Sequence, residues 1–348
     1  MKYCTYIFLF FIFLLNGRDT LSQVKGIVST FAGKNTYGSL DGKGEAATFN
    51  KPTGLVISKE GNIYLADRDN NKIRKITKAG IVTTLAGNGT KGFINGAGHS
   101  ASFNWPSAIA IDALGNLYIA DQGNNMIRKI NSEGIVSTFA GNGTIGSKNG
   151  SSQMSTFNEP IGIAVDGSGN VYVVEFGSSL IRKITPQGQV STFAGGSSDD
   201  DKIDGVGTAA SFFNPTGIAV DKLGNIFVAD QGNNLIRKIT PQGLVTILAG
   251  KKTDGNTDGV GNLASFSYPS AVTVDVNGNV FVADELNKKI RKISATGIVT
   301  TLAGTGIGGS IDGAAKLATF YGPHGIAVDN TGNIFIVDGG KLRKLTIQ

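Results

Sequence analysis

The chain has 348 residues, a formal net charge of +6 and an apolar fraction of 40%. This mild positive charge is spread along the chain rather than gathered in a block, so it gives little support for a nucleic-acid or membrane-surface partner. Cys4 is the only cysteine. The chain therefore has no internal disulfide, and its stability must come from packing.

The N-terminal segment, residues 1–22, predicts a secretory signal peptide. Lys2 is followed by an apolar run over residues 6–15 and then by small and polar residues up to Ser22. The run is about half as long as a bilayer-spanning helix, and Cys4 precedes it, whereas a lipoprotein cysteine would follow it. We expect cleavage near Ser22–Gln23 and a secreted, periplasmic or cell-surface protein, with no transmembrane segment in residues 23–348.

A repeat fills residues 23–348. The tetrad Ile-Arg-Lys-Ile, or a close copy, recurs with a period of about 54 residues, and a Gly-Asn pair precedes each copy. The arginines of the six copies are Arg74, Arg128, Arg182, Arg237, Arg291 and Arg343. We expect features shared by all copies to serve the fold, and features of one copy to be candidates for function.

The first complete copy predicts four strands. Short runs rich in β-branched and aromatic residues cover residues 55–57, 63–66, 72–76 and 81–86, each bounded by Gly, Asn or Asp. None has the 3.6-residue period of a helix, so we expect antiparallel strands. The stretch over residues 44–49 could add one helical turn.

Four strands repeated six times predict an all-β fold, a six-bladed β-propeller of four-stranded antiparallel blades. The strand ending in Phe-Ala-Gly or Leu-Ala-Gly first occurs at residues 27–33, before the first complete copy, whereas the last copy ends at Gln348 without one. We expect this N-terminal strand to complete the last blade and close the ring, which removes the open edge at the seam. A closed ring of this kind is expected to be monomeric.

Three motifs identify a resemblance. Pro-x-Gly before an apolar run, Gly-Asn before the second strand and Asn-x-x-Ile-Arg-Lys-Ile resemble the NHL repeat over essentially all of residues 23–348. The resemblance implies a six-bladed propeller that serves as a platform for protein or RNA. Related six-bladed folds include a peptide-amidating lyase, an antibiotic lyase and lactonases, so the fold alone does not decide the function.

Each copy is longer than the usual NHL unit because a Gly-rich connection, such as residues 88–106, precedes its Pro. A phenylalanine occupies the same place in every connection. We expect its ring to be buried and to pin the loop, since burial of a Phe contributes roughly 1.5–3 kcal/mol; a functional loop is the alternative. The phenylalanines are Phe49, Phe103, Phe157, Phe212, Phe266 and Phe320.

An acidic residue ends the second strand of every copy, a few residues before the arginine. We expect the two to pair partly hidden between blades, the alternative being a ring of carboxylates around a cation. The acids are Asp67, Asp121, Glu175, Asp230, Asp284 and Asp338. The Arg-Lys pairs could form a nucleic-acid stripe, but pairing with these acids and an exported location disfavour that interpretation.

The residues that begin the innermost strands are expected to ring one mouth of the channel and to contact a ligand. They are Thr53, Ser107, Ile161, Thr216, Ser270 and His324. Neutral imidazole suits a metal ligand or a general base. The only other histidine, His99, lies in a long connection, and the related metal-dependent lyases use several histidines, so a metal has little support.

Two aromatic residues and one acidic loop complete the candidates. Trp105 is the only tryptophan, and Phe176 belongs to the third copy, whose sequence departs most from the others. Both aromatic rings suit binding of a peptide or sugar, and packing between blades is the alternative. Calcium or another divalent cation could bind the acidic loop, although a solvated loop is favoured and no cofactor is expected. The loop contains Asp199, Asp200, Asp201 and Asp204.

These features favour an exported, non-enzymatic binding scaffold whose protein, peptide or glycan partner docks at one mouth of the channel. The alternative is a metal-assisted lyase or lactonase that uses His324 with Glu175 or a neighbouring carboxylate. No Ser-His-Asp or Cys-His arrangement can be located in the sequence.

Overall fold

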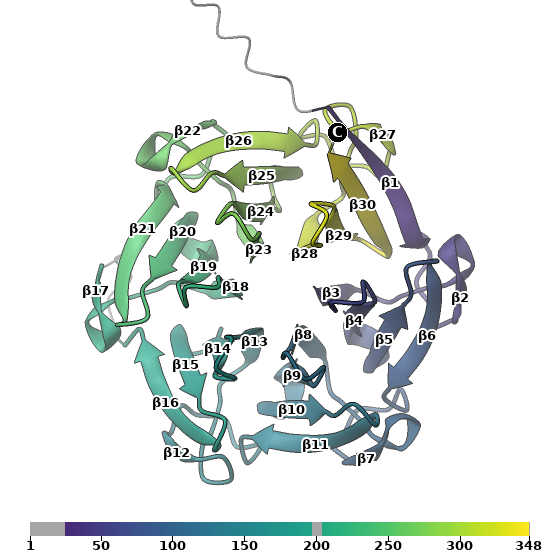
Figure 1. The fold of residues 1–348 in the computed structure, drawn as a ribbon, viewed down its shortest axis with the longest axis vertical. Helices are drawn as coiled ribbons and strands as arrows, with labels where there is room; N and C mark the ends of the chain where they lie inside the picture. Colours follow the sequence, from purple (N-terminus) through teal and green to yellow (C-terminus); the bar gives the residue numbers. More distant parts are fainter. Residues whose placement is uncertain (1–24, 197–203, 348) are drawn as a thin grey trace, which may run out of the picture.

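The computed structural model describes residues 25–196 and 204–347, which form a six-bladed β-propeller (Figure 1). This confirms the predicted fold class. The predicted signal peptide lies outside the described residues, so it stays a prediction. In the described part of the chain, no helix has the length and apolar character needed to cross a membrane.

Each blade is an antiparallel sheet whose strands follow one another from the channel outwards. The innermost strands are β3 (Pro52–Ile57), β8 (Pro106–Ile111), β13 (Pro160–Val165), β18 (Pro215–Val220), β23 (Pro269–Val274) and β28 (Pro323–Val328). The second strands are β4 (Ile63–Asp67), β9 (Leu117–Asp121), β14 (Val171–Glu175), β19 (Ile226–Asp230), β24 (Val280–Asp284) and β29 (Ile334–Asp338). The third strands are β5 (Lys72–Ile76), β10 (Met126–Ile130), β15 (Leu180–Ile184), β20 (Leu235–Ile239), β25 (Lys289–Ile293) and β30 (Lys341–Ile347). The fourth strands are β6 (Ile81–Ala86), β11 (Ile135–Ala140), β16 (Gln189–Ala194), β21 (Leu244–Gly250), β26 (Ile298–Ala303) and β1 (Gly26–Gly33).

The long connections add a fifth, two-residue strand outside the four that the sequence predicts. Each pairs antiparallel with the fourth strand of its blade, as Gly42 does with Val82. These short strands are β2 (Gly42–Lys43), β7 (Gly96–Ala97), β12 (Gly150–Ser151), β17 (Gly205–Val206), β22 (Gly259–Val260) and β27 (Gly313–Ala314). The connections therefore fold back on the outer edge of their own blades, which shields the edge strand from further pairing.

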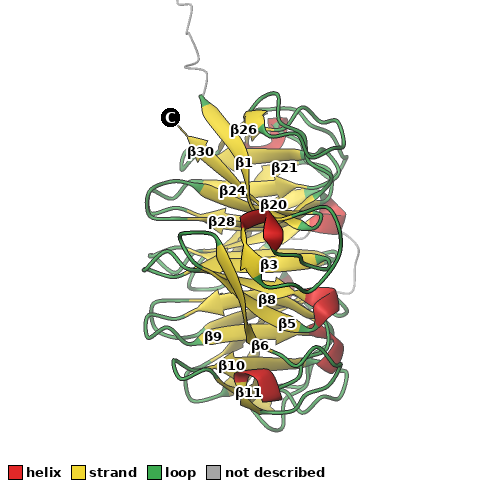
Figure 2. Ribbon diagram, turned by 90° about the vertical axis from the view of Figure 1, so that its right-hand side faces the viewer, coloured by secondary structure: helices red, strands yellow, loops and turns green. Residues whose placement is uncertain are grey.

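Single turns of 3-10 helix occur at two places in the repeat. One follows the short strand, where the sequence allowed a helical turn: η1 (Gly44–Ala46), η3 (Gly98–Ser100), η5 (Gly207–Ala209) and η7 (Gly261–Leu263). The other follows the second strand: η2 (Arg68–Asn70), η4 (Gln122–Asn124) and η6 (Gln231–Asn233). Seen edge-on, loops project from both faces of the disc (Figure 2).

The N-terminal strand closes the ring, as expected from the sequence. β1 lies between β30 and β27, with Val28 opposite Leu345 and Ile27 opposite Ala314. Asp312 adds a side-chain link across this seam. Its carboxylate accepts hydrogen bonds from the Thr30 N–H at 2.7 Å and from Arg343 Nη2 at 2.7 Å. The last blade is thus built from both ends of the chain.

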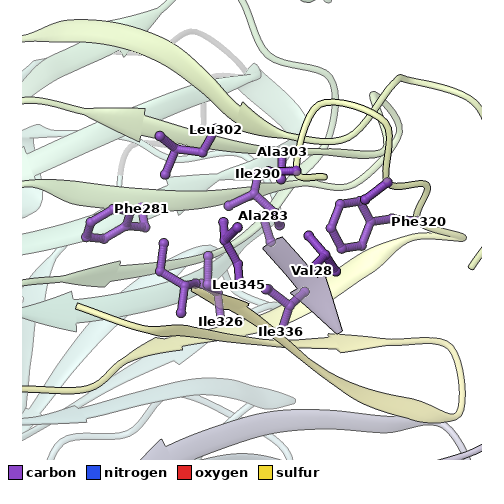
Figure 3. Packing of buried hydrophobic residues seen from close by; sticks show 13 residues of the cluster. Val28, Phe281, Ala283, Ile290, Leu302, Ala303, Phe320, Ile326, Ile336 and Leu345 are labelled. Carbon is purple, nitrogen blue, oxygen red and sulfur yellow. The ribbon is translucent and has the colours of Figure 1, made fainter. Parts of the chain in front are cut away.

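The core consists of apolar layers between neighbouring blades. The second strands are buried almost throughout, which explains why their sequence is apolar on both faces. Figure 3 shows one layer, in which Phe320 from a long connection lies beside Val28 of the closing strand. Every connection contributes a phenylalanine that is at most 5% exposed. The expected pinning of the loops by a buried ring is therefore confirmed.

A buried arginine joins the parts of each blade. In the second blade, Arg128 Nη1 donates to Asp121 Oδ2 at 2.9 Å and to the Ser102 carbonyl at 3.0 Å. Its Nη2 donates to Asn95 Oδ1 at 2.6 Å, and its guanidinium carbon lies 5.4 Å from the Phe103 ring centroid. The acid–arginine pair is fully buried in all six blades. The structural interpretation of the shared acids is therefore confirmed.

Candidate functional site

The innermost strands surround a central cavity of about 440 Å³. Aliphatic side chains such as Val56, Ile109 and Ile326 contribute to its walls, together with polar groups. The first residue of each innermost strand pairs with the acid that ends the second strand, as Pro52 does with Asp67. Residues just after that acid therefore lie at the same end of the cavity as the start of the innermost strand. We call this end the mouth.

The six predicted ligand positions at the start of the innermost strands all line the cavity. Four of them carry hydroxyl groups that donate to the neighbouring blade. Thr53 Oγ1 donates to the Ser107 carbonyl at 2.6 Å, and Thr216 Oγ1 donates to the Ser270 carbonyl at 2.9 Å. Because these protons join adjacent blades, only the hydroxyl lone pairs remain for a ligand. Ligand binding by these residues stays a prediction.

Blade six carries His324 at this position. Its side chain is 43% exposed, and its Nδ1 lies 3.5 Å from Glu285 Oε2 of blade five without forming a hydrogen bond. Burial lowers the pKa of His324 below its ordinary value; Glu285 opposes this shift and the Arg68 charge adds to it. The ring therefore has a nitrogen, Nδ1, with no hydrogen-bond partner.

Glu175, which the enzyme alternative paired with His324, is not beside it. The Glu175 side chain is fully buried and accepts hydrogen bonds from Arg182, Ser178 and Ser147, the last at 2.6 Å. Burial raises its pKa, and these donors act in the opposite direction. Glu175 thus has the structural role of the shared acids. The carboxylate near His324 is Glu285, which the sequence reasoning did not single out.

A second ring at the mouth is formed by the residue that follows the shared acid. The six residues differ in charge and size: Arg68, Gln122, Phe176, Gln231, Glu285 and Gly339. Arg68 and Gln122 line the cavity. Of this ring, the sequence reasoning identified only Phe176, whose N–H donates to the Glu159 carbonyl at 3.0 Å. The other five could have been found from the sequence, because each directly follows the acid that ends the second strand.

Trp105 lies in a third ring, just before the innermost strand of blade two. Its φ is 53°, and its N–H donates to Asn71 Oδ1 of the first blade at 3.0 Å. The residue is 38% exposed, with Arg68 Cζ 5.0 Å and Lys91 Nζ 4.5 Å from its ring centroid. No ring–ring contact joins Trp105 to Phe176, although both are described. Its partners at the mouth are cations.

The candidate calcium loop is only partly described. Asp199, Asp200 and Asp201 lie outside the described residues. Asp204 accepts a hydrogen bond from Arg237 Nη2 at 2.7 Å and so belongs to the buried arginine network. Among residues 25–196 and 204–347, no three His, Cys, Asp or Glu side chains gather as a metal site would require.

The sequence reasoning missed the outer partners of the buried arginines. Each is an Asp or Asn in the long connection whose side chain accepts a hydrogen bond from the arginine Nη2. They are Asp41, Asn95, Asn149, Asp204, Asp258 and Asp312. In all six copies a glycine follows directly. The recurring Asp-Gly or Asn-Gly pair is therefore the sequence feature from which these arginine partners could have been predicted.

Comparison with known sequences supports the repeat assignment. The sequence model of the NHL repeat matches residues 49–76 and 212–239. The chain is 34% identical over 274 residues to SUPPRESSOR OF QUENCHING 1, chloroplastic, of Arabidopsis thaliana, a match that covers 74% of this chain and 26% of that protein. It is 29% identical over 313 residues to NHL repeat-containing protein 2 of Bos taurus, covering 79% of this chain and 43% of that protein. The chain thus spans less than half the length of these relatives.

Solved structures agree in fold. A structural-genomics protein of unknown function from Bacteroides thetaiotaomicron has a TM-score of 0.72 at 22% identity, covering 93% of this chain and 76% of that one. An auxiliary nutrient binding protein of the same species has a TM-score of 0.71 at 18% identity, covering 93% and 77%. A streptogramin B lyase has a TM-score of 0.59 at 14% identity, covering 93% and 98%. At these identities the likeness concerns the fold alone. The motifs, the family match and the six-bladed architecture together identify this chain as an NHL-repeat protein that folds as a six-bladed β-propeller.

Proposed function

We propose that this protein is an exported, non-enzymatic binding scaffold whose ligand docks at the mouth of the channel. The observation that carries the proposal is the contrast between the buried residues that all six blades share and the residues at the mouth, which differ from blade to blade. The buried arginine, its acid and the phenylalanine recur in every blade, whereas the residue next to the acid changes from Arg68 to Phe176 to Glu285. Unlike side chains on equivalent, rigid backbone positions give a repeat protein a specific surface.

The cavity below the mouth supports a ligand with an apolar part. Its volume of about 440 Å³ falls within the range of ligand pockets, roughly 300–1,000 Å³. Its walls combine aliphatic side chains with polar groups, and the hydroxyl, amide and imidazole side chains at the mouth would fix the orientation of a ligand. The fold neighbour named as an auxiliary nutrient binding protein shows that this architecture can serve binding, without showing which ligand this chain takes.

The test is a peptide and glycan array screened with residues 23–348, followed by the same screen with a mouth variant. Substituting Arg68→Gln and Trp105→Asn places at each position a residue that another blade already carries there. We expect at least one ligand that the parent binds and this variant loses. A ligand set that is unchanged in the variant would contradict docking at the mouth.

Catalysis is the second candidate, and the contact between His324 and Glu285 is the observation that favours it. An imidazole nitrogen without a hydrogen-bond partner could accept a proton or hold a metal when the ring is neutral. Metal analysis of the purified protein separates the two proposals. A stoichiometric ion that is lost in the His324→Ala variant would support a metal-assisted lyase or lactonase, whereas an unchanged metal content supports the scaffold.

Export is proposed from the sequence of residues 1–22. Expression of the complete chain in a bacterial host with cell fractionation tests it. We expect the protein outside the cytoplasm with a mature N-terminus near Gln23, read by N-terminal sequencing. An uncleaved chain in the cytoplasmic fraction contradicts the proposal.

A further inference from the structure

At the mouth between blades five and six, two hydrogen-bond acceptors face each other without a donor. His324 Nδ1 lies 3.5 Å from Glu285 Oε2, and this buried nitrogen has no hydrogen-bond partner. In the described part of the chain, Glu285 accepts no hydrogen bond and forms no ion pair with a lysine or arginine, including Lys288 of its own loop. We call these two residues the His324–Glu285 pair.

Glu285 differs in this respect from the other acids of residues 25–196 and 204–347. The acids that end the second strands contact arginine, and the Asp residues at the opposite end of the innermost strands accept hydrogen bonds from Asn, as Asp112 does. Four other acids also lack a donor, but all four are exposed to water, whereas only 29% of the Glu285 side chain is exposed. The four exposed acids are Glu45, Glu133, Glu159 and Asp254.

Such a pair is unfavourable by itself, because the lone pairs of two acceptors repel and a partly buried carboxylate has lost hydration that no donor replaces. Burial lowers the pKa of His324, the Glu285 carboxylate opposes this shift and the Arg68 charge adds to it. The net shift favours the unprotonated ring, which accepts a hydrogen bond. The charge of Arg68 is itself offset by Asp69 at 3.4 Å. The pair therefore lacks a donor that can reach both atoms.

The sequence of blade six makes the pair accessible. Only Gly339 and Gly340 separate the second and third strands of this blade, whereas four residues do so in every other blade, such as residues 68–71 in blade one. The imidazole side chain remains 43% exposed. It also lines the central cavity, together with Leu55 and Ile326 further along the innermost strands. A ligand held by the pair can thus place an apolar group in the cavity.

We infer that the His324–Glu285 pair binds a primary ammonium group whose apolar substituent enters the cavity, an inference that rests on the proposed function and specifies its ligand. An ammonium group donates one N–H to Glu285 Oε2 and another to His324 Nδ1, and its charge offsets the carboxylate. A metal ion fits less well, because the described residues place no third His, Cys, Asp or Glu beside these two.

The experiment is calorimetric titration of residues 23–348 with hexylamine, hexyltrimethylammonium and hexanol. The three probes share the apolar chain, but the second has no N–H and the third has no charge. We expect hexylamine to bind at least roughly tenfold more tightly than either of the others. The tripeptide Leu-Ala-Ala distinguishes the two sources of an ammonium group. Binding tighter than that of hexylamine assigns the site to a peptide N-terminus, and weaker binding assigns it to a free amine.

Two variants test the pair itself. Glu285→Gln and His324→Ser each introduce a residue that other blades carry at the same position, and each should weaken hexylamine binding roughly tenfold or more. Glu159→Gln is the matched control, since it removes an exposed carboxylate elsewhere on the mouth, and it should leave the affinity unchanged. Thermal melts show that each variant is folded.

Four results would overturn the inference: no binding of hexylamine, equal binding of its trimethyl analogue, unchanged affinity in both pair variants, or a stoichiometric metal ion that His324→Ser removes. In the first case a proton on His324 alone completes the pair. The array screen separates this failure from that of the proposed function. If an array ligand is lost in the mouth variant while hexylamine does not bind, docking at the mouth stands and only the ligand class is wrong. If no array ligand depends on the mouth and hexylamine does not bind, both fail.

Discussion

At the scale of the residue, the structure depends on six buried arginines and their acids. Each arginine contacts a carboxylate, backbone carbonyls, a phenylalanine ring and an Asp or Asn of the long connection. Burial raises the pKa of Asp121 to about 6, although hydrogen bonds from Asn104, Asn124 and Arg128 act against the shift. An ion pair of this kind adds little net stability when intact, and breaking it leaves a buried charge without a partner.

We therefore expect Arg128→Leu to reduce the free energy of unfolding by about 3–5 kcal/mol at pH 7. The variant removes the cation and leaves the Asp121 carboxylate buried. Chemical denaturation measures the effect, and Arg68→Gln, at a partly exposed position of the mouth, is the control, with an expected change within about 1 kcal/mol. Equal stability of the two variants would show that the buried pair has no structural role.

The sequence revealed the shared residues but not all their contacts. Six-fold recurrence showed that Asp121 and Arg128 belong to the fold, because functional residues do not recur in every copy. It did not show that Asn95, far away in the chain, completes the same network, since the path of a long Gly-rich connection is not encoded by strand periodicity. His324 was identified as exceptional, but its neighbour Glu285 lies in another blade. The sequence suggested Glu175 or a neighbouring carboxylate as its partner; Glu175 is a structural acid, and the neighbouring carboxylate is Glu285.

At the scale of the element, the closing strand β1 differs from the other fourth strands because it comes from the opposite end of the chain to the rest of its blade. It is held by pairing with β30 and by Asp312. Burial raises the pKa of Asp312, but hydrogen bonds from Thr30 and the Arg343 guanidinium outweigh this and bring it below its ordinary value. A carboxyl group whose pKa is lower in the folded than in the unfolded chain stabilises the fold when ionised. This contribution is present above about pH 4 and is lost as the pH falls through the lowered pKa.

The Asp312→Asn variant should therefore be less stable than the parent at pH 7, by about 1 kcal/mol or less because the carboxylate is partly exposed. The difference should shrink as the pH falls from about 4 towards 3, because the carboxyl of the unfolded chain takes up a proton in this range while the lowered pKa keeps that of the folded chain ionised longer. Asn is compatible with the site, since Asn95 and Asn149 have this role in other blades. Thermal melts at pH 7 and pH 3 measure the effect. A stability gap that widens on acidification contradicts the sign of the shift.

The strand pattern itself was predictable from the sequence. Short apolar runs bounded by Gly, Asn and Asp marked four strands in each blade, and the early Phe-Ala-Gly strand predicted the closure by β1. The fifth strand was not predictable in this way, because a two-residue pairing such as that of Gly42–Lys43 has no propensity signal. Only contact with the edge of the blade defines it.

At the scale of the whole molecule, ring closure should make the ends of the chain essential to all blades. Deleting residues 23–34 removes β1, leaves β30 with an unpaired edge and exposes the apolar layer around Val28. We expect a lower melting temperature and a larger radius in solution, measured by calorimetry and small-angle scattering. A truncated chain that melts at the temperature of the parent would contradict closure by this strand.

The central claim is that the shared residues build the ring while the unshared residues at its mouth bind the ligand. A single variant tests it: Arg68→Gln, Trp105→Asn, Phe176→Gln, Glu285→Gln and His324→Ser, each replacement being a residue that another blade carries at that position. Its melting temperature and its binding of the ligand found on the array are measured side by side. The account predicts a melt within a few degrees of the parent, because these side chains are partly exposed and lie outside the buried arginine network, together with loss of binding. Unfolding of the variant, or binding with unchanged affinity, would contradict it.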